Sequence, residues 1–254
     1  MKEYLFVSDL DNTLLYSIKH KIEKGICIEK KAGRHQGIMS EYTYRNLEKI
    51  CKLTDFVPLT SRSIEQYFRI CWSKKHFPEY ALVTNGAVLI KNGQIDSEWL
   101  EHSKALVSDY INEMEKLYRF FVRAGEYTTC RIVDGMYVFV YCHDEVQARC
   151  CMEEYAYKTD FHVIAHGKKL YFLPEIFHKG AAVKRIREIF KEKKIIAAGD
   201  SIMDIPMLKE ADVSLLPETI SAVCFEYRKK IVHADSDELF SDFVSRNVLE
   251  ICQK

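Results

Sequence analysis

The feature that most constrains the fold is a short, mainly apolar run near the start of the chain that stops at an acidic residue. Tyr4 to Ser8 form the run, and Asp9, Asp11 and Thr13 follow it. This pattern predicts a buried strand with polar residues at its carboxyl end. Residues two apart in an extended segment face the same side, so both carboxylates can address a ligand just beyond the strand. Taken alone, the pattern also fits a solvated turn.

Similar runs recur along the chain and alternate with amphipathic helical stretches. This alternation predicts an α/β fold, with a doubly wound, Rossmann-like, mostly parallel sheet flanked by helices. Helices are expected to begin near Ser40 and after Arg62, where stripes of apolar residues follow polar starts. The further predicted strands are Phe56 to Leu59, Tyr80 to Val83, Ile195 to Ala198 and Val213 to Leu215.

The middle of the chain has a different pattern. A hairpin through Asn92-Gly93, one long helix around 103–121 and several short strands predict an inserted α+β domain over residues 87–173. Residues 1–86 and 174–254 then form the core. The segment Ile18 to Met39 is too irregular to assign, and it is either a lid or an exposed insertion.

Composition narrows the class of function. The chain has 254 residues, with 37 basic and 37 acidic ones, so no global field recruits nucleic acid or an anionic membrane. A small-molecule substrate is therefore expected, and we expect a monomer or a small homo-oligomer. The nine cysteines include no CxxC pair, and the amino terminus lacks the apolar region of a signal peptide. These features favour a cytoplasmic protein without a membrane span.

Three other segments carry candidate chemistry at the ends of predicted strands or the start of a helix. The hydroxyls and amides of Thr60 and Ser61 can bind phosphate oxygens, although a simple helix cap is the alternative. Lys179 begins a helix, where a cation is disfavoured unless an anion lies nearby, so it could neutralise a phosphoryl group or remain solvated. An aspartate such as Asp9 can attack phosphorus, while a second carboxylate gives and takes a proton.

A second acidic group follows the strand that ends at Ala198. Asp200, Ser201 and Asp204 come after Gly199, and Pro206 suits the first turn of the next helix. Oxygen ligands without histidine or thiolate favour Mg²⁺, with Asp9 and Asp200 as the natural ligands. Ser201 and Asp204 also fit a helix-capping pattern, so Asp204 has a metal-related role or a capping role.

These residues resemble the haloacid dehalogenase superfamily, subfamily IIB, whose Cof and sucrose-phosphatase-like members carry a C2-type cap. All four motifs of that family occur in order, and the TNGA segment at Thr84 to Ala87 resembles the entry to its cap. The motifs are Asp9 to Thr13, Thr60 to Arg62, Lys179, and Gly199 to Asp204. The resemblance spans the whole chain and implies that residues 87–173 form a cap that selects the substrate.

The resemblance implies a Mg²⁺-dependent phosphatase that acts on a small phosphomonoester, with a sugar or polyol phosphate as the first expectation. Asp9 would form an aspartyl-phosphate, and Asp11 would protonate the leaving group and then activate water. Mg²⁺ would be held by Asp9, the Asp11 backbone carbonyl and Asp200. The remaining expected roles are phosphate binding by Thr60, Ser61 and Lys179, support by Thr13, Ser201 and Asp204, and substrate binding by Arg62 and Asn85.

Two departures from the family pattern concern the phosphate contacts. Ser61 stands where many relatives have glycine, and Met203 stands where many have asparagine. Two other functions stay open at this point. A sugar phosphomutase uses the same aspartyl-phosphate, and a regulatory protein could bind a phosphorylated ligand without turnover.

Overall fold

The chain forms two compact units in the computed structural model, which describes residues 2–220, 230–235 and 237–253. The first unit comprises Met1–Ile95 and Lys179–Lys254, and the second comprises Asp96–His178. The insertion was predicted to span 87–173, so both observed boundaries lie later in the sequence. At the first boundary, the strands after residue 87 belong to a small sheet. Leu82 of that sheet forms a β-bridge with Leu59, so the small sheet stays with the first unit.

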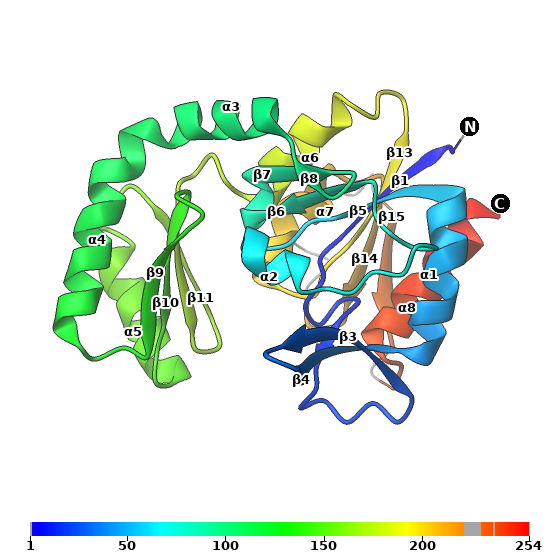
Figure 1. Cartoon of the computed structure of the whole chain (residues 1–254), viewed down its shortest axis with the longest axis horizontal. Coiled ribbons are helices and arrows are strands. Elements are labelled where there is room, and N and C mark those ends of the chain that lie inside the picture. Colours follow the sequence, from blue (N-terminus) through cyan, green and yellow to red (C-terminus); the bar gives the residue numbers. More distant parts are fainter. Residues whose placement is uncertain (1, 221–229, 236, 254) are drawn as a thin grey trace. The chain divides into compact units, whose positions relative to one another are not determined.

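A five-stranded parallel sheet forms the centre of the first unit (Figure 1). Its order is β15-β14-β13-β1-β5, and every neighbouring pair is parallel, as the alternating pattern predicts. The strands are β1 (Tyr4–Ser8), β5 (Thr54–Pro58), β13 (Lys194–Ala198), β14 (Val213–Pro217) and β15 (Lys230–Ala234). The inner strands read as nearly continuous apolar runs because both of their faces are buried.

Helices cover the two faces of this sheet in pairs (Figure 1). On one side α1 (Glu41–Leu53) packs against α8 (Phe240–Cys252), and on the other α6 (Lys179–Arg187) packs against α7 (Ile205–Glu210). Ser40 caps α1 by accepting a hydrogen bond from the Thr43 N–H. The short helix α2 (Ile64–Phe68) begins after Ser63, which forms a capping box with Gln66. The predicted doubly wound fold is confirmed.

Two small antiparallel sheets complete the first unit. One has the order β6-β7-β8, with β6 (Tyr80–Val83), β7 (Val88–Lys91) and β8 (Gln94–Ile95), and its last turn is the predicted Asn92-Gly93 hairpin. The other has the order β2-β4-β3, with β2 (Tyr16–Ser17), β3 (Gly25–Lys31) and β4 (Arg34–Ser40). The segment that the sequence pattern left unassigned is therefore a β-hairpin that pairs with the stretch after the first acidic motif.

The second unit is an α+β layer structure. Its antiparallel sheet has the order β11-β12-β10-β9, with β9 (Thr129–Val133), β10 (Tyr137–Tyr141), β11 (His162–His166) and β12 (Lys169–Leu173). The helices α4 (Ile111–Ala124) and α5 (Glu145–Tyr155) pack against it, and the ring of Phe121 lies 5.3 Å from that of Phe172.

The prediction of one long helix over 103–121 was wrong. The structure has α3 (Ser97–Val107) and α4, separated by the 3-10 turn η2 (Ser108–Tyr110). Ser108 Oγ donates to the carbonyl oxygen of Ala105 at 2.8 Å. Such a local bond from a serine side chain to the backbone competes with regular helix geometry, which explains a break at this position.

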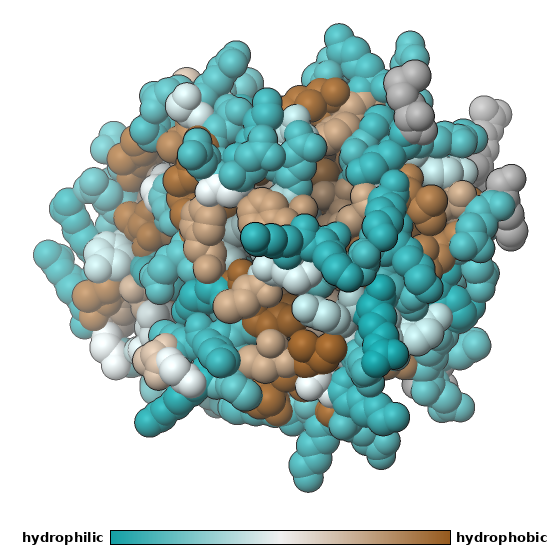
Figure 2. Space-filling view, turned by 45° about the vertical axis from the view of Figure 1, so that its right-hand side comes forward, coloured by the Kyte–Doolittle hydropathy of each residue, from teal (hydrophilic) through white to brown (hydrophobic). Residues whose placement is uncertain are grey.

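Three general features concern the surface, the helices and the cysteines. Figure 2 shows a face where hydrophilic side chains predominate, with smaller apolar areas between them. Among the described residues, no helix is long and apolar enough to cross a membrane. The eight cysteines in the described part of the chain are free thiols.

Candidate active site

Three neighbouring strands of the central sheet end at one edge, and predicted site residues follow each of them. The strands β5, β1 and β13 are adjacent and parallel. Asp9 directly follows β1, Thr60 comes after β5, and Asp200 comes after β13. The Asp9 N–H donates to the carbonyl of Ala198 at 2.9 Å, so the pairing of β1 with β13 continues to the first carboxylate. Ligands of open parallel sheets bind beyond this edge.

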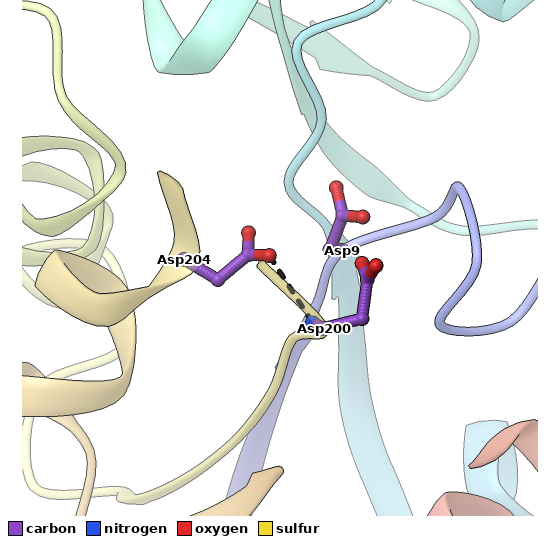
Figure 3. Close-up of side chains that lie close together, drawn as sticks. All are labelled: Asp9, Asp200 and Asp204. Atoms are coloured by element: carbon purple, nitrogen blue, oxygen red, sulfur yellow. Dashed lines mark hydrogen bonds between the residues drawn. The ribbon is translucent and has the colours of Figure 1, made fainter. Parts of the chain in front are cut away.

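Three carboxylates gather at the edge, and we call them the acidic cluster (Figure 3). They belong to Asp9, Asp200 and Asp204, the last of which lies in the 3-10 turn η3 (Ile202–Asp204). One oxygen from each of the three lies within 4.8 Å of the others. Like charges this close repel one another, so the cluster needs a cation to remain fully ionised.

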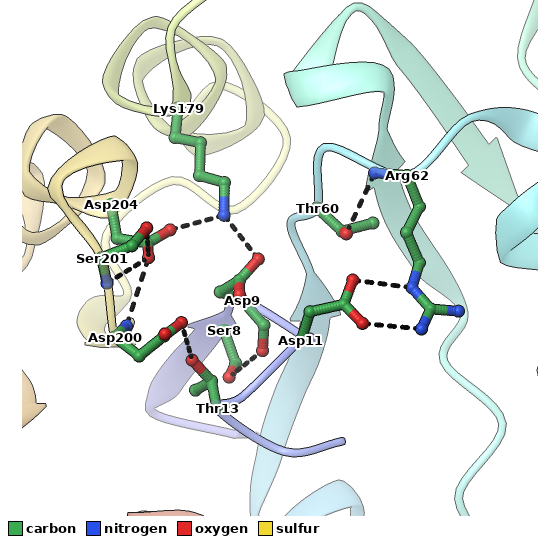
Figure 4. A network of polar contacts seen from close by, with 10 residues as sticks. All are labelled: Ser8, Asp9, Asp11, Thr13, Thr60, Arg62, Lys179, Asp200, Ser201 and Asp204. Carbon is green, nitrogen blue, oxygen red and sulfur yellow. Dashed lines mark hydrogen bonds and ion pairs between the residues drawn. The ribbon is translucent and has the colours of Figure 1, made fainter. Parts of the chain in front are cut away.

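Lys179 supplies one positive charge to the acidic cluster (Figure 4). Its Nζ donates to Asp9 Oδ1 and to Asp204 Oδ1, each at 2.5 Å, and the residue is only 2% exposed. Burial by itself would lower the pKa of Lys179, but the carboxylates of Asp204 and Asp9 outweigh burial and raise that pKa above its usual value. The ammonium therefore stays charged, and the solvated-lysine alternative is excluded.

Asp204 is the anchor of the loop after β13. Its Oδ2 accepts hydrogen bonds from the Asp200 N–H at 3.2 Å, from the Ser201 N–H at 3.0 Å and from Ser201 Oγ at 2.8 Å. Its other oxygen binds Lys179. A Cβ atom at Gly199 would lie 2.4 Å from the Asp204 Cβ, so only glycine lets the loop fold this tightly. Both oxygens of Asp204 are used by the protein itself, which favours the capping role over metal binding.

Asp9 and Asp200 retain more open coordination. Asp9 gives one oxygen to Lys179, and Asp200 Oδ1 accepts from Thr13 Oγ1 at 3.1 Å. Burial raises the pKa of the Asp9 carboxyl well above its usual value, and the Lys179 charge opposes this. Burial and the Asp204 charge together raise the pKa of Asp200 to about 6. Both pKa values are therefore raised mainly because burial disfavours the ionised carboxylate, with the neighbouring carboxylates adding to the effect.

Asp11 points away from the acidic cluster and toward Arg62 (Figure 4). Arg62 Nε donates to Asp11 Oδ2 at 2.8 Å and Nη2 donates to Oδ1 at 2.7 Å, which is a bidentate pair. The Asp11 side chain is 42% exposed, whereas that of Arg62 is 11% exposed. The predicted proton-transfer residue thus keeps access to solvent while a buried guanidinium fixes its direction.

Sequence reasoning missed two residues behind this pair. Glu29 of β3 lies 3.0 Å from Arg62 Nη1 and 3.2 Å from Arg69 Nε, and its side chain is 5% exposed. We call Asp11, Arg62, Glu29 and Arg69 the guanidinium cluster. A lone acidic residue in a segment without periodicity carries no signal of such a role, so no motif could have identified Glu29.

The residues predicted to bind phosphate lie next to these clusters. Thr60 is fully buried, and its Oγ1 accepts from the Arg62 N–H at 3.2 Å. The Asn85 N–H donates to the Thr60 carbonyl at 2.9 Å, which joins the loop after β5 to the turn after β6. Asn85 is 2% exposed and has a left-handed φ of 57°. Ser61 is half-buried between Thr60 and Arg62.

The chain was also compared with known proteins. A family model described as haloacid dehalogenase-like hydrolase matches residues 57–216, which is more than half of the chain. The chain belongs to this hydrolase family. No curated protein matches the sequence. The resemblance to this family is therefore confirmed, and the protein is a hydrolase.

Solved structures share the fold of this haloacid dehalogenase-like hydrolase over nearly its whole length. The sucrose-phosphatase of Synechocystis sp., solved with sucrose and phosphate, is 14% identical, with a TM-score of 0.59, and the match covers 98% of this chain and 99% of that one. A haloacid dehalogenase-like hydrolase from B. subtilis is 13% identical, with a TM-score of 0.60, and the match covers 99% and 100%.

A third solved structure shares this fold. The trehalose-6-phosphate phosphatase of Aspergillus fumigatus is 14% identical, with a TM-score of 0.54, and the match covers 100% of this chain and 94% of that one. At such low identity these likenesses establish the fold of the hydrolase. Because each of these matches extends over both compact units, the fold likeness includes the inserted α+β unit as well as the core.

Proposed function

We propose that this hydrolase is a Mg²⁺-dependent phosphatase that cleaves a small phosphomonoester through an aspartyl-phosphate on Asp9. The observation that carries the proposal is the Asp9 carboxylate itself. It stands at the carboxyl end of β1, bonded to the buried Lys179 and within 4.8 Å of carboxylate oxygens of Asp200 and Asp204. A carboxylate held beside a fixed cation is suited to attack an anionic phosphoryl group, because the cation reduces the repulsion between them.

The reaction has two balanced steps. In the first, an Asp9 oxygen forms a bond to phosphorus, the bond from phosphorus to the ester oxygen breaks, and the departing oxygen takes a proton from Asp11, which must be protonated for this step although its pair with Arg62 favours the carboxylate. In the second, water attacks the phosphorus of the aspartyl-phosphate and loses a proton to the Asp11 carboxylate. The bond to Asp9 breaks, inorganic phosphate leaves, and both carboxyl groups return to their starting states.

The acidic cluster fits a divalent cation by its charge and its ligand type. Three carboxylates lie beside the Lys179 ammonium, so the ionised cluster keeps a net negative charge that a divalent cation would offset. Asp9, Asp200 and the Asp11 backbone carbonyl would hold Mg²⁺, which prefers oxygen ligands. When bound, Mg²⁺ supplies further neutralisation of charge on the phosphoryl oxygens. Asp204 supports this site by holding the loop that carries Asp200.

The phosphoryl oxygens would be bound by the loop after β5 and by the Lys179 ammonium, which also contacts Asp9. Thr60, Ser61 and Lys179 are the proposed contacts, with Thr60 fixed in place by its backbone bonds to Leu82 and Asn85. Catalysis of phosphoryl transfer depends mainly on such positioning and charge neutralisation. Thr13 would hold Asp200 through the bond from its hydroxyl.

We infer that the substrate is a sugar or polyol phosphate selected by the α+β unit. Two proteins of the same fold bear the names sucrose-phosphatase and trehalose-6-phosphate phosphatase, which supports this class. Asn85 remains a proposed substrate contact. Arg62 is a poorer one than the sequence predicted, because its guanidinium already pairs with the carboxylates of Asp11 and Glu29.

The test is phosphate release from p-nitrophenyl phosphate and a panel of sugar phosphates, with and without Mg²⁺. We expect Mg²⁺-dependent release that is lost in Asp9→Asn and reduced by about 10²–10⁴-fold in Asp11→Asn. Asp109→Asn, an exposed carboxylate in the other unit, is the matched control and should retain activity. Release that survives in Asp9→Asn would contradict the proposal. Isomerisation of a sugar phosphate without net release would instead identify a phosphomutase.

A further inference from the structure

Glu29 is a buried carboxylate between two guanidinium groups. It is 4% exposed, with Oε2 at 3.0 Å from Arg62 Nη1 and Oε1 at 3.2 Å from Arg69 Nε. Each carboxylate oxygen therefore has its own cation. Buried charged groups are kept only when they are paired in this way, so the position is built to hold a carboxylate.

The backbone around Glu29 is shaped to aim its side chain inward. The register between β3 and β4 shifts on both sides of Glu29, and Glu29 forms a β-bridge with Ile70. The Cys71 N–H also donates to the Ile28 carbonyl at 2.7 Å, which ties the hairpin to the chain just after α2. Bulges of this kind redirect a side chain within a sheet and are frequent next to active sites.

Gly37 on the neighbouring strand leaves the space that the Glu29 side chain fills. A Cβ atom at Gly37 would lie 2.9 Å from Glu29 Oε2 and 3.1 Å from Glu29 Cβ. Any larger residue would displace the carboxylate oxygen that lies beside Arg62. The bulge and the glycine of the hairpin thus both help to hold the Glu29 carboxylate in place.

Arg62 links the Glu29 carboxylate to the candidate active site. Its Nη1 faces Glu29, while its Nε and Nη2 hold both oxygens of Asp11. The planar guanidinium is therefore fixed between two carboxylates, and its direction sets the direction of Asp11. Burial lowers the pKa of Arg62, but the hydrogen bonds and charge of Asp11 and the charge of Glu29 outweigh it and keep the group charged.

We propose that Glu29 is a positioning residue for the reaction, acting through Arg62 on the Asp11 carboxylate. The inference rests on the proposed function, in which Asp11 transfers the protons. Glu29 touches none of the proposed phosphate contacts, so its loss should affect the chemical steps and leave phosphate binding intact. Without the Glu29 charge, Arg62 and Arg69 lose the carboxylate that they share, and Arg62 moves together with the Asp11 that it holds.

The experiment compares Glu29→Gln with the matched control Glu65→Gln in the full chain. Glu65 is 83% exposed and pairs with Arg69 at 3.9 Å. Glu65→Gln therefore removes an exposed charge next to the guanidinium cluster. With p-nitrophenyl phosphate and Mg²⁺, Glu29→Gln should lower kcat by about 10–100-fold with KM changed by less than about twofold. Glu65→Gln should match the wild type. The inhibition constant of inorganic phosphate should stay unchanged in both variants.

A double-mutant cycle separates positioning from a general loss of structure. In an Asp11→Asn background Glu29→Gln should lower kcat no further, because its effect runs through Asp11. Gly37→Ala keeps all four charges and displaces the Glu29 carboxylate, so it should lower kcat in the same direction by a smaller factor. This variant tests the inference even where Glu29→Gln does not fold.

The outcomes are distinguishable from those of the proposed function. An inactive wild type, or an active Asp9→Asn, would overturn the proposed function and this inference with it. An active wild type whose kcat is unchanged or raised in Glu29→Gln would overturn the inference alone. An equal fall of kcat in the wild-type and Asp11→Asn backgrounds would also overturn it.

Discussion

The two charged clusters at the edge of the central sheet differ in balance. The acidic cluster has three carboxylates and the single ammonium of Lys179, whereas the guanidinium cluster alternates two carboxylates with two guanidinium groups. Most side chains of both clusters are buried, apart from that of Asp11, which is 42% exposed, and both clusters contain short ion pairs. The first therefore has an excess of negative charge, and the second has none.

This difference suggests two kinds of task. A buried site with excess charge gains stability from a ligand of opposite charge, so the acidic cluster is suited to bind a cation and then an anionic substrate. A balanced cluster gains nothing from a further ion, so it is suited to hold a side chain in one direction. The predictions that follow test this contrast.

The largest effect is expected from removing the cation that the described residues place in the acidic cluster. Lys179→Met leaves three neighbouring carboxylates without a counter-charge, so it should destabilise the fold by about 3–5 kcal/mol at neutral pH. It should also lower phosphate release by about 10²–10³-fold. Urea unfolding measures the first quantity. Lys184→Met, whose side chain on the same helix is 66% exposed, should change stability by less than about 0.5 kcal/mol. A similar small change in Lys179→Met would refute the contrast.

Mg²⁺ should stabilise the protein through the acidic cluster. At a concentration of 100 times its Kd the ion should add about 2.7 kcal/mol, seen as a rise in Tm. Asp200→Asn should lose most of this rise, whereas Asp11→Asn should keep it, because Asp11 is expected to contribute its backbone carbonyl. Equal shifts in the two variants would show that the ion binds elsewhere.

The Asp200 pKa of about 6 gives this stabilisation a pH dependence. Because the folded pKa is raised above the usual value of 3.8, protonation of Asp200 stabilises the metal-free fold. This contribution to stability is fully present below about pH 3.8 and is lost as the pH rises through about 6. The ionised carboxylate is the form that binds Mg²⁺. The rise in Tm should therefore be larger at about pH 7.5 than at about pH 5.

A smaller effect is expected in the guanidinium cluster. Arg69→Met removes one of the two cations that face Glu29 and leaves the Arg62 pair in place, so it should cost about 1–2 kcal/mol of stability. Urea unfolding at neutral pH measures this cost. Arg45→Met, which breaks an exposed pair with Glu41, should cost less than about 0.5 kcal/mol. A loss as large as that expected for Lys179→Met would mean that balance does not distinguish the clusters.

The sequence predicted the acidic cluster far better than the guanidinium cluster, for a physical reason. Asp9 and Asp200 follow apolar strands, and parallel strands bring their carboxyl ends to one edge, so position in the sequence predicts position in space. Lys179 could be recognised because a cation is unusual at the start of a helix. The roles of all three in catalysis remain predictions.

Glu29 shows why the rest escaped prediction. Its partners Arg62 and Arg69 are 33 or more positions away in the sequence, and its inward direction depends on a register shift against β4. Neither the bulge nor the bridge to Ile70 leaves a periodic pattern. The break between α3 and α4 was missed for a similar reason, because one local serine bond interrupts an otherwise helical pattern.

A buried histidine outside the two clusters gives stability a further dependence on pH. His76 is 3% exposed, with the ring of Tyr44 edge-on at 4.6 Å and that of Trp72 at 6.3 Å. Within the described residues its two ring nitrogens have no hydrogen-bond partner. Burial lowers the pKa of His76 below its usual value of 6.5, against weaker opposing effects of its own backbone and of the Glu48 charge.

The smallest predicted effect follows from the sign of this shift. Below about pH 6.5 the unfolded chain binds a proton at His76 before the folded chain does, so stability falls as the pH drops until the folded pKa is passed. His76→Phe should reduce this slope, measured by urea unfolding at several pH values, while the exposed control His35→Gln should leave it unchanged. If His76→Phe keeps the wild-type slope, groups other than His76 cause the loss of stability in this range, and Asp200, whose raised pKa gives a slope of the opposite sign, is not one of them.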